Sequence, residues 1–225
     1  STTGWSFPIF LIDNINLVGA GEDLTIIDAE LTSSVLVFYN QDNISISDLT
    51  ITGGAASAAG GINLFRSDIT MTHVTIRNNG SNTSGLHMLY SNPTLTDVTV
   101  NDNNGGGIVL ISSNPTMTNM IISGNNSSSY GGGIQMIQSN PILINGTISG
   151  NTTWRGGGIF LMESNPTLID VTLNDNTGSF VGGGISAVDS SPTLMNVTIS
   201  GNSAISGGGL HLDNCTSILT NVTIS

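Results

Sequence analysis

Glycine triplets recur along most of the chain at a nearly constant interval. Their last residues are spaced by 26, 25, 26 and 25 residues, at Gly107, Gly133, Gly158, Gly184 and Gly209. Prolines keep the same interval, at Pro93, Pro115, Pro141, Pro166 and Pro192. Self-similarity at a fixed period of roughly 20 to 50 residues indicates a solenoid or another repeat array. The chain is therefore expected to stack copies of one supersecondary unit.

One repeat unit contains three short stretches in which the side chains alternate in character, namely 94–96, 98–100 and 108–110. Alternation with period two indicates β-strands, and β-branched residues are abundant in these stretches. The phase slips between the first two stretches, so the chain must bend near Asp97 to keep its apolar residues inside. The unit therefore predicts three short strands joined by three corners, with no amphipathic helix.

Three strands per turn, with one repeat per turn, predict an all-β fold: a right-handed parallel β-helix of about eight turns of about 25 residues. Equivalent residues of successive turns then form columns. The two apolar inner columns are predicted to be Ile46, Met71, Leu95, Met117, Leu143, Leu168, Leu194 and Leu219, and Ile51, Ile76, Val100, Ile122, Ile148, Leu173, Ile199 and Ile224.

Two polar columns are predicted at the corners. One is Asp48, His73, Asp97, Asn119, Asn145, Asp170, Asn196 and Asn221. The other is a structural asparagine ladder of Asn79, Asn103, Asn125, Asn151, Asn176 and Asn202. Asparagine tolerates the left-handed backbone conformation, and stacked amides can bond to one another along the axis. Both columns are thus interpreted as structural.

The alternation of GGGI with NVTISGN resembles the right-handed parallel β-helix repeats of the pectate-lyase-like superfamily. It is most similar to repeat-rich bacterial surface proteins such as the polymorphic outer-membrane adhesins. The resemblance covers residues 14–225, and LVGAGEDLTIIDA (Leu17–Ala29) resembles the opening turn of many such proteins. The superfamily includes lyases, hydrolases, epimerases, adhesins and phage spikes, so the resemblance implies a fold rather than an activity.

Composition narrows the choice of partners. The chain of 225 residues has 15 acidic residues and 3 basic ones, a net charge of −12 and no lysine, which disfavours nucleic acid and anionic membranes. No apolar run reaches the ~20 residues of a membrane helix, so membrane insertion is not expected. The single cysteine, Cys215, excludes an intrachain disulfide. Few charges with abundant Ser, Thr and Asn are typical of secreted solenoids, and we expect an extracellular or cell-surface location.

The two ends of the sequence differ from the repeat. Residues 1–13 are predicted to form an N-terminal cap in which Trp5, Phe7 and Phe10 cover the core. Residues 14–225 are predicted to form the β-helix, which is expected to continue or stack beyond residue 225 because the sequence stops inside a strand. Open β-helix edges are adhesive, so self-association end to end or side by side is one expected partnership.

A catalytic site has one candidate cluster, Arg66, Asp68 and Asp42. A polysaccharide lyase uses a base, often Arg or Lys, and calcium-binding carboxylates. Asp42 and Asp68 are predicted in one column and could share a calcium ion, the only cofactor considered. A surface ion pair with corner residues explains the cluster better. Metal binding by His87 and His211, in one outward column five turns apart, is weakly indicated.

An outward threonine array is predicted on successive turns: Thr70, Thr72, Thr94, Thr96, Thr116 and Thr118. Flat Thr-x-Thr arrays resemble the binding faces of β-helical ice-binding proteins. Here the array is interrupted by Ile142, Ile144, Ile169 and Met195. Threonine is also simply a favourable strand residue.

A contact or assembly strip is predicted from apolar residues that recur on the outside: Tyr130, Trp154, Phe180 and Ile205, with Ile142, Ile144 and Ile169 on another face. Exposed aromatic strips mark contact surfaces, which stack sugar rings or pack against a neighbouring rod. The alternative, weighed equally, is that these side chains lie flat over the corners and cover the glycines.

The preferred functional interpretation is a non-enzymatic extracellular structural or adhesive surface protein, either a β-helix stalk or a subunit of a self-assembling fibre. Its expected partners are copies of itself or cell-surface glycans. A polysaccharide-active enzyme, such as a calcium-dependent lyase, and an ice-binding protein are the alternatives.

Overall fold

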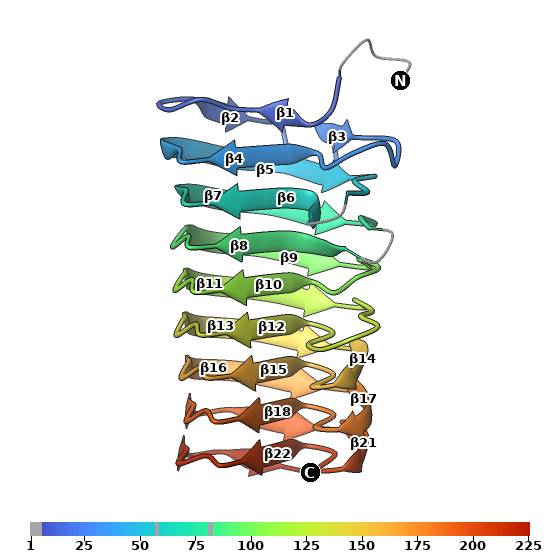
Figure 1. Ribbon diagram of the computed structural model, residues 1–225, viewed down its shortest axis with the longest axis vertical. Coiled ribbons are helices and arrows are strands. Elements are labelled where there is room, and N and C mark those ends of the chain that lie inside the picture. Colours follow the sequence, from blue (N-terminus) through green and yellow to red (C-terminus); the bar gives the residue numbers. More distant parts are fainter. Residues whose placement is uncertain (1–5, 57–58, 81–82) are drawn as a thin grey trace.

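The computed structural model describes residues 6–56, 59–80 and 83–225. The chain winds into a stack of β-coils along one axis, with every paired strand parallel to its neighbour (Figure 1). No α-helix occurs in the described part, and no helix there is long and apolar enough to span a membrane. The predicted all-β parallel solenoid, with equivalent strands about 25 residues apart, is confirmed.

Three parallel sheets line the coil. Sheet A consists of β1 (Ile9–Phe10), β4 (Leu36–Tyr39), β6 (Ala59–Phe65), β8 (Ser84–Leu89), β10 (Ile108–Ile111), β12 (Ile134–Ile137), β15 (Ile159–Met162), β18 (Ile185–Val188) and β22 (Leu210–Asp213). Sheet B consists of β2 (Asn16–Val18), β3 (Ile26–Asp28), β5 (Asp42–Thr52), β7 (Asp68–Arg77), β9 (Thr94–Asn101), β11 (Thr116–Ser123), β13 (Ile142–Ser149), β16 (Thr167–Asn174), β19 (Thr193–Met195), β20 (Thr198–Ser200), β23 (Ile218–Thr220) and β24 (Thr223–Ile224). Sheet C is shorter and consists of β14 (Thr152–Arg155), β17 (Thr177–Val181) and β21 (Ser203–Ser206).

The bend predicted near Asp97 lies within sheet B. Every member of its column has a positive φ, from 50° at His73 to 58° at Asp48. In the middle coils the bend occurs inside one continuous strand such as β9, because a single left-handed residue redirects the chain without ending the hydrogen-bond ladder. In the last two coils it separates β19 from β20 and β23 from β24. In many coils, therefore, two of the three predicted strands are one continuous bent strand of sheet B.

The predicted inner columns form the core. Their members are fully buried from Ile46 to Leu194 in the first column and from Ile51 to Ile199 in the second. Each buried Leu or Ile side chain contributes about 1.5–3 kcal/mol relative to exposure. Leu219 and Ile224, in the last coil, are exposed because no coil follows them in this sequence.

The asparagine ladder is buried between sheets B and A. Asn125 Nδ2 donates to Asn151 Oδ1 at 2.9 Å and to the Val100 carbonyl at 2.9 Å, and Asn125 N donates to the same Asn151 oxygen at 3.0 Å. The predicted amide stacking is confirmed. The predicted left-handed conformation of the ladder residues is wrong, because it belongs to the residue before each of them.

The left-handed residue preceding each ladder asparagine is Asn78, Asp102, Gly124, Gly150, Asp175 or Gly201, with φ between 52° and 64°. This preceding residue makes the turn, which leaves the asparagine side chain pointing into the coil. There it satisfies carbonyls that would otherwise be buried without partners, at a cost of about 1–3 kcal/mol each.

The Ser-Asn-Pro motif at the corner between sheets A and B has a structural role that the sequence analysis did not predict. Ser113 N donates to the Ser139 hydroxyl at 3.1 Å, and Ser139 Oγ donates to the Ile137 carbonyl at 2.8 Å, entirely inside the corner. On the outside, Asn140 N donates to Asn114 Oδ1 at 2.6 Å. The Ser-Asn-Pro motif therefore forms one buried serine ladder and one exposed asparagine ladder along the axis of the β-helix.

The N-terminal residues belong partly to the first coil. β1 pairs with β4, with Ile9 opposite Leu36. Phe7 packs against the core, whereas Phe10 is 66% exposed and does not cover it, because alternation along β1 turns it outward. Trp5 lies outside the described residues.

Candidate functional site

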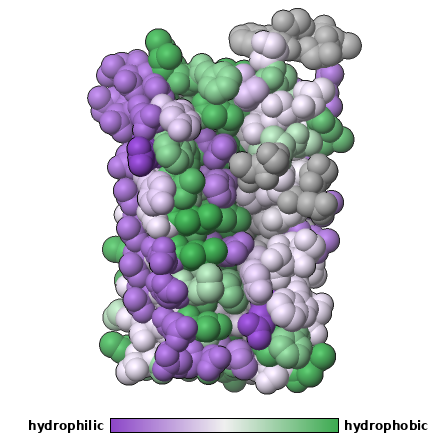
Figure 2. Space-filling model, viewed as in Figure 1, coloured by the Kyte–Doolittle hydropathy of each residue, from purple (hydrophilic) through white to green (hydrophobic). Residues whose placement is uncertain are grey.

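The outer face of sheet A carries a continuous column of apolar side chains over seven coils. Strand register aligns Tyr39, Phe65, Leu89, Ile111, Ile137, Met162 and Val188. Figure 2 shows the resulting band of hydrophobic surface along this face. Parallel strands in register place identical positions on top of one another, so an outward apolar residue in each repeat becomes a stripe. This stripe is the floor of the candidate site.

A hollow of about 220 Å³ opens on this floor in the C-terminal half. Its lining residues are Tyr130, Gln135, Ile137, Arg155, Phe160, Met162 and Val188. The floor comes from β12, β15 and β18. The wall comes from Tyr130 and Arg155, which lie on the segments that precede sheet A strands and pair with each other in parallel. We call this concavity the Arg155 hollow.

Aromatic rings from successive coils stack beside the hollow. Tyr130 stacks on Phe160 with ring centroids 4.6 Å apart, and Trp154 stacks on Phe180 at 5.5 Å with only 9° between the planes. Phe160 points outward from β15, yet only 3% of it is exposed. Tyr130 covers it, which the alternation pattern alone did not predict. Trp154 and Phe180 remain 44% and 41% exposed.

Arg155 lies among these rings. Its guanidinium carbon is 5.1 Å from the Trp154 ring centroid and 5.5 Å from that of Phe180. Its Nε is buried without a hydrogen-bond partner, and no described carboxylate forms an ion pair with it. A guanidinium without a carboxylate partner beside a concavity has the chemistry to pair with an anionic group. We call Tyr130, Trp154, Arg155, Phe160 and Phe180 the Arg155 cluster.

The predicted contact strip separates into two surfaces. Trp154, Phe180 and Ile205 lie at equivalent places on sheet C, and Ile205 is 82% exposed. Ile142, Ile144 and Ile169 project from the outer face of sheet B, with Ile144 opposite Ile169. The rings of Trp154 and Phe180 stack on each other and stay partly exposed.

A second aromatic column lies at the other edge of sheet A, in the N-terminal half, and the sequence reasoning missed it. Tyr39 stacks on Phe65 at 4.5 Å, and Phe65 meets Tyr90 edge to face at 6.2 Å. Arg66 lies over Phe65 at 5.1 Å and over Tyr90 at 5.8 Å. The recurrence of aromatic residues at intervals near 25 was the available signal. We call Tyr39, Phe65, Arg66 and Tyr90 the Arg66 cluster.

The structure brings two of the three predicted catalytic residues, Asp42 and Asp68, into adjacent coils, and their contacts are those of a corner. Asp42 and Asp68 occupy one column, as expected, but Asp68 Oδ1 accepts a hydrogen bond from Asn92 N at 2.6 Å as part of the outer ladder. Arg66 lies on the aromatic rings and forms no ion pair with Asp68. Among the described residues, no three His, Cys, Asp or Glu side chains are placed to hold a metal ion. Calcium binding by Asp42 and Asp68 therefore stays a hypothesis without a third protein carboxylate.

The histidines occupy separate structural positions. His87 and His211 share an outward column of sheet A, as predicted, in distant coils. His87 Nδ1 lies 3.2 Å from Asn63 Oδ1, and desolvation by burial lowers the pKa of His87. His73 stands in the corner column between Asp48 and Asp97, with N–O distances of 3.5 and 3.6 Å.

The threonine array has the predicted register but a limited extent. Thr94 stands opposite Thr70 and Thr116, and Thr96 stands opposite Thr72 and Thr118. The next coil replaces both positions by Ile142 and Ile144. The threonine array therefore spans three coils of sheet B, and Ser45 and Ser47 occupy the same positions in the coil before it.

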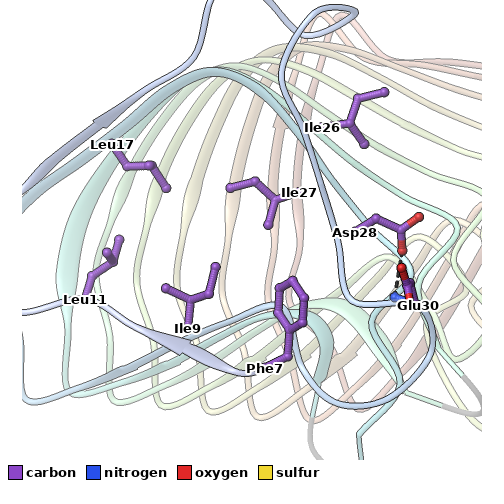
Figure 3. A pocket seen from close by; sticks show the side chains of 8 residues that line it. All are labelled: Phe7, Ile9, Leu11, Leu17, Ile26, Ile27, Asp28 and Glu30. Atoms are coloured by element: carbon purple, nitrogen blue, oxygen red, sulfur yellow. Dashed lines mark hydrogen bonds between the residues drawn. The ribbon is translucent and has the colours of Figure 1, made fainter. Parts of the chain in front are cut away.

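The open N-terminal end of the core forms a larger hollow of about 460 Å³. Its lining residues are Phe7, Ile9, Leu11, Leu17, Ile26, Ile27, Asp28 and Glu30. In Figure 3 the side chains of Phe7, Ile9, Leu11, Leu17 and Ile27 point into the coil, whereas Ile26 and Asp28 point away from it. The two polar residues lie at one side, where Asp28 Oδ1 accepts a hydrogen bond from Glu30 N at 2.8 Å. This hollow continues the hydrophobic core and offers little polar chemistry for recognition.

Comparison with known proteins defines the family. The model of the right-handed β-helix region matches residues 84–225, and the chain belongs to this family. The predicted right-handed fold is thereby confirmed. No curated protein sequence matches the chain.

Solved structures with similar winding have low sequence identity. The A-module of the Azotobacter vinelandii mannuronan C-5 epimerase AlgE4 is 16% identical, with a TM-score of 0.41 over 96% of this chain and 81% of that one. The AlgE6 A-module from the same organism is 15% identical, with a TM-score of 0.31 over 93% and 84%. The pentapeptide repeat protein HetL from Nostoc sp. strain PCC 7120 is 10% identical, with a TM-score of 0.25 over 97% and 88%. These distant likenesses carry no argument about activity, and the predicted closeness to adhesins is not confirmed.

Proposed function

We propose that this chain is a non-catalytic extracellular surface protein that binds glycans on the outer face of sheet A. The observation that carries the proposal is the Arg155 cluster, in which stacked, half-exposed rings and an unpaired guanidinium border a hollow. Sugar rings have apolar faces that pack on aromatic rings, and their polar groups require a few fixed hydrogen-bond donors. The apolar stripe of sheet A extends this surface along the rod.

Binding is favoured over cleavage by the distribution of acidic groups. Glycoside hydrolysis needs two carboxyl groups about 5–9.5 Å apart across the scissile bond. Glu163 follows β15 at the opposite edge of sheet A and accepts a hydrogen bond from Gln138 Nε2 at 2.9 Å. No described carboxylate lines the Arg155 hollow. The surface therefore has recognition groups without an acid–base pair.

An extracellular or cell-surface location accompanies this proposal. Hydrogen-bonded ladders, rather than disulfides, hold the coils together, and the outward positions are mostly neutral Ser, Thr and Asn. A rigid solenoid of this kind presents a binding face at a fixed distance from whatever carries it. Side-by-side association through Trp154, Phe180 and Ile205 is the competing use of the same rings.

The test is binding of the purified 225-residue chain to an array of neutral and acidic oligosaccharides, followed by titration calorimetry with the ligands retained. Trp154→Ala is expected to weaken binding at least tenfold, because the exposed ring contacts sugar and its loss leaves the core intact. The matched control, Tyr90→Ala, removes an exposed ring from the Arg66 cluster and is expected to change affinity less than twofold. Absence of any retained glycan, or ring-dependent dimers in sedimentation equilibrium instead, would contradict the proposal.

A further inference from the structure

Resting on the proposed glycan site, we infer that the Arg155 hollow selects one carboxylated sugar unit within an otherwise uncharged glycan. Arg155 lines the hollow, and its guanidinium carbon lies 5.1 and 5.5 Å from the ring centroids of Trp154 and Phe180. Its buried Nε is closed to a ligand, so the two terminal nitrogens are the donors that face one. The two terminal nitrogens of a guanidinium form a fork that matches the two oxygens of a carboxylate. A sugar carboxylate would accept hydrogen bonds from these two nitrogens.

The strength of this contact depends on its surroundings. The hollow is lined by Ile137, Phe160, Met162 and Val188, which keep water away from part of the guanidinium. An ion pair at an effective dielectric constant of about 20 is roughly fourfold stronger than in bulk water. One carboxylate is therefore enough to distinguish an acidic sugar from its neutral counterpart.

The size of the hollow limits what enters it. Its volume of about 220 Å³ is smaller than the ~300–1,000 Å³ typical of sites for drug-sized ligands. We therefore assign it to a single ring, with Gln135 and the Tyr130 hydroxyl as the polar groups nearest to the sugar hydroxyls. The remainder of the glycan then lies along the apolar stripe of sheet A.

The charge pattern along the same coils excludes a polyanion. Arg155 stands at the edge where the sheet A strands begin, whereas Glu163 and Asp189 directly follow β15 and β18 at the opposite edge. Arg66 belongs to the other cluster and Arg77 to sheet B, so no second cation borders the hollow. A polymer with an acid on every sugar would place further carboxylates near Glu163 and Asp189. The complementary ligand carries its charge at one end.

The experiment uses methyl glycosides of galacturonic, glucuronic and N-acetylneuraminic acid, each paired with its uncharged methyl ester, and polygalacturonate as the polyanion. Titration calorimetry on the wild-type chain is expected to show at least tenfold tighter binding of one or more acids than of the matching ester. Polygalacturonate is expected to bind more weakly per sugar than the best single acid. Arg155→Gln should abolish the preference for the acid, Arg155→Lys should retain part of it, and Arg66→Gln should leave it unchanged.

The outcomes separate this inference from the proposed function. Equal affinity for acids and esters, with glycan binding still lost in Trp154→Ala, would overturn the acid selection and leave glycan binding in place. Tighter binding of polygalacturonate than of every single acid would overturn the restriction to one carboxylate. A preference that persists in Arg155→Gln would overturn the role of Arg155. If no saccharide binds, both proposals fail.

Discussion

The Arg66 and Arg155 clusters each combine an arginine with stacked aromatic rings, at opposite edges of sheet A, and the Arg155 cluster borders a hollow. In both, an arginine lies about 5–6 Å from two aromatic ring centroids contributed by neighbouring coils. Arg66 is exposed at a corner with φ 49°, where the chain turns directly into sheet B. Arg155 is half-buried and forms the wall of a hollow.

The difference arises from the segments that precede and follow the sheet A strands. After each strand, one left-handed residue turns the chain away, so side chains such as Tyr39 lie on a convex corner. Before β12 and β15, Tyr130 pairs in parallel with Arg155 at the end of β14 in sheet C, and both side chains line the hollow beside sheet A. Residue type alone therefore does not define a binding site, because concavity and an unsatisfied polar atom are also required.

The largest expected effect comes from breaking the asparagine ladder at Asn151, in the coil that carries Arg155. The ladder residues in the coils of the Arg66 cluster stay unchanged. Asn151→Ala would delete the amide that bonds Asn176 Oδ1 at 2.9 Å and Ile122 O at 3.0 Å, and would leave Asn125 N without its acceptor. We expect a loss of about 2–4 kcal/mol in the free energy of unfolding, measured by urea denaturation. Asn104→Ala, at an exposed neighbouring position, is the control and should change it by less than about 0.5 kcal/mol.

A second pair of variants compares one ring type in the two clusters. Phe160→Ala removes a ring that is sealed between β15 and Tyr130, and should cost about 2–3 kcal/mol of unfolding free energy. Phe65→Ala removes a half-buried ring and should cost about 1 kcal/mol. Equal losses in urea denaturation would show that the two aromatic columns are packed alike, contrary to the structure.

A third pair predicts effects of opposite sign. Arg155→Met should raise the free energy of unfolding by about 0.5–1 kcal/mol, because it removes a buried Nε without a partner and keeps an apolar side chain among the rings. Arg66→Met should lower it by about 0.5 kcal/mol, because an exposed cation–π contact is lost. Thermal and urea unfolding of both variants give the two signs. A decrease for Arg155→Met would mean that this arginine stabilises the fold.

The smallest expected effect concerns His87, on β8, the strand that Tyr90 of the Arg66 cluster follows. Desolvation by burial lowers the pKa of His87 below its ordinary value of about 6.5, so the unfolded chain binds more protons than the folded chain at acidic pH. Its contribution is fully present above about pH 6.5 and declines as the pH falls toward the folded pKa. His87→Gln should flatten this decline between pH 7.5 and about 5, in urea midpoints. His211→Gln, in the same outward column, should leave it in place.

Much of the fold could be predicted because each repeat reports the same structure independently. The columns through Leu95 and Val100, the bend at Asp97 and the amide ladder follow from period-two alternation combined with a fixed repeat. The left-handed residue beside the ladder was assigned one position too late. Sequence alone does not show which of two adjacent polar residues points inward, since Asp102 and Asn103 are both suitable corner residues.

The candidate site was less predictable than the fold. Trp154 and Phe180 were found from their recurrence, but Phe160 was missed because it is outward by alternation and buried only by Tyr130. Tyr130 pairs in backbone register with Arg155 rather than with Trp154, although its ring is 5.8 Å from the Trp154 ring. A shift of one residue between coils decides where the hollow forms, and the repeat pattern does not contain that information.

The asparagine and serine ladders have an evolutionary consequence. Each ladder bond joins a coil to its immediate neighbours only, for example Asn103 to Asn125 and Ser113 to Ser139. Duplication or deletion of one whole coil would leave every remaining donor matched, so the rod can change length in steps of about 4.8 Å. The Arg155 hollow draws on β12, β15 and β18 together with the segments before them. Duplications elsewhere would carry the hollow along the axis intact, and selection could tune its distance from an attachment point without altering its chemistry.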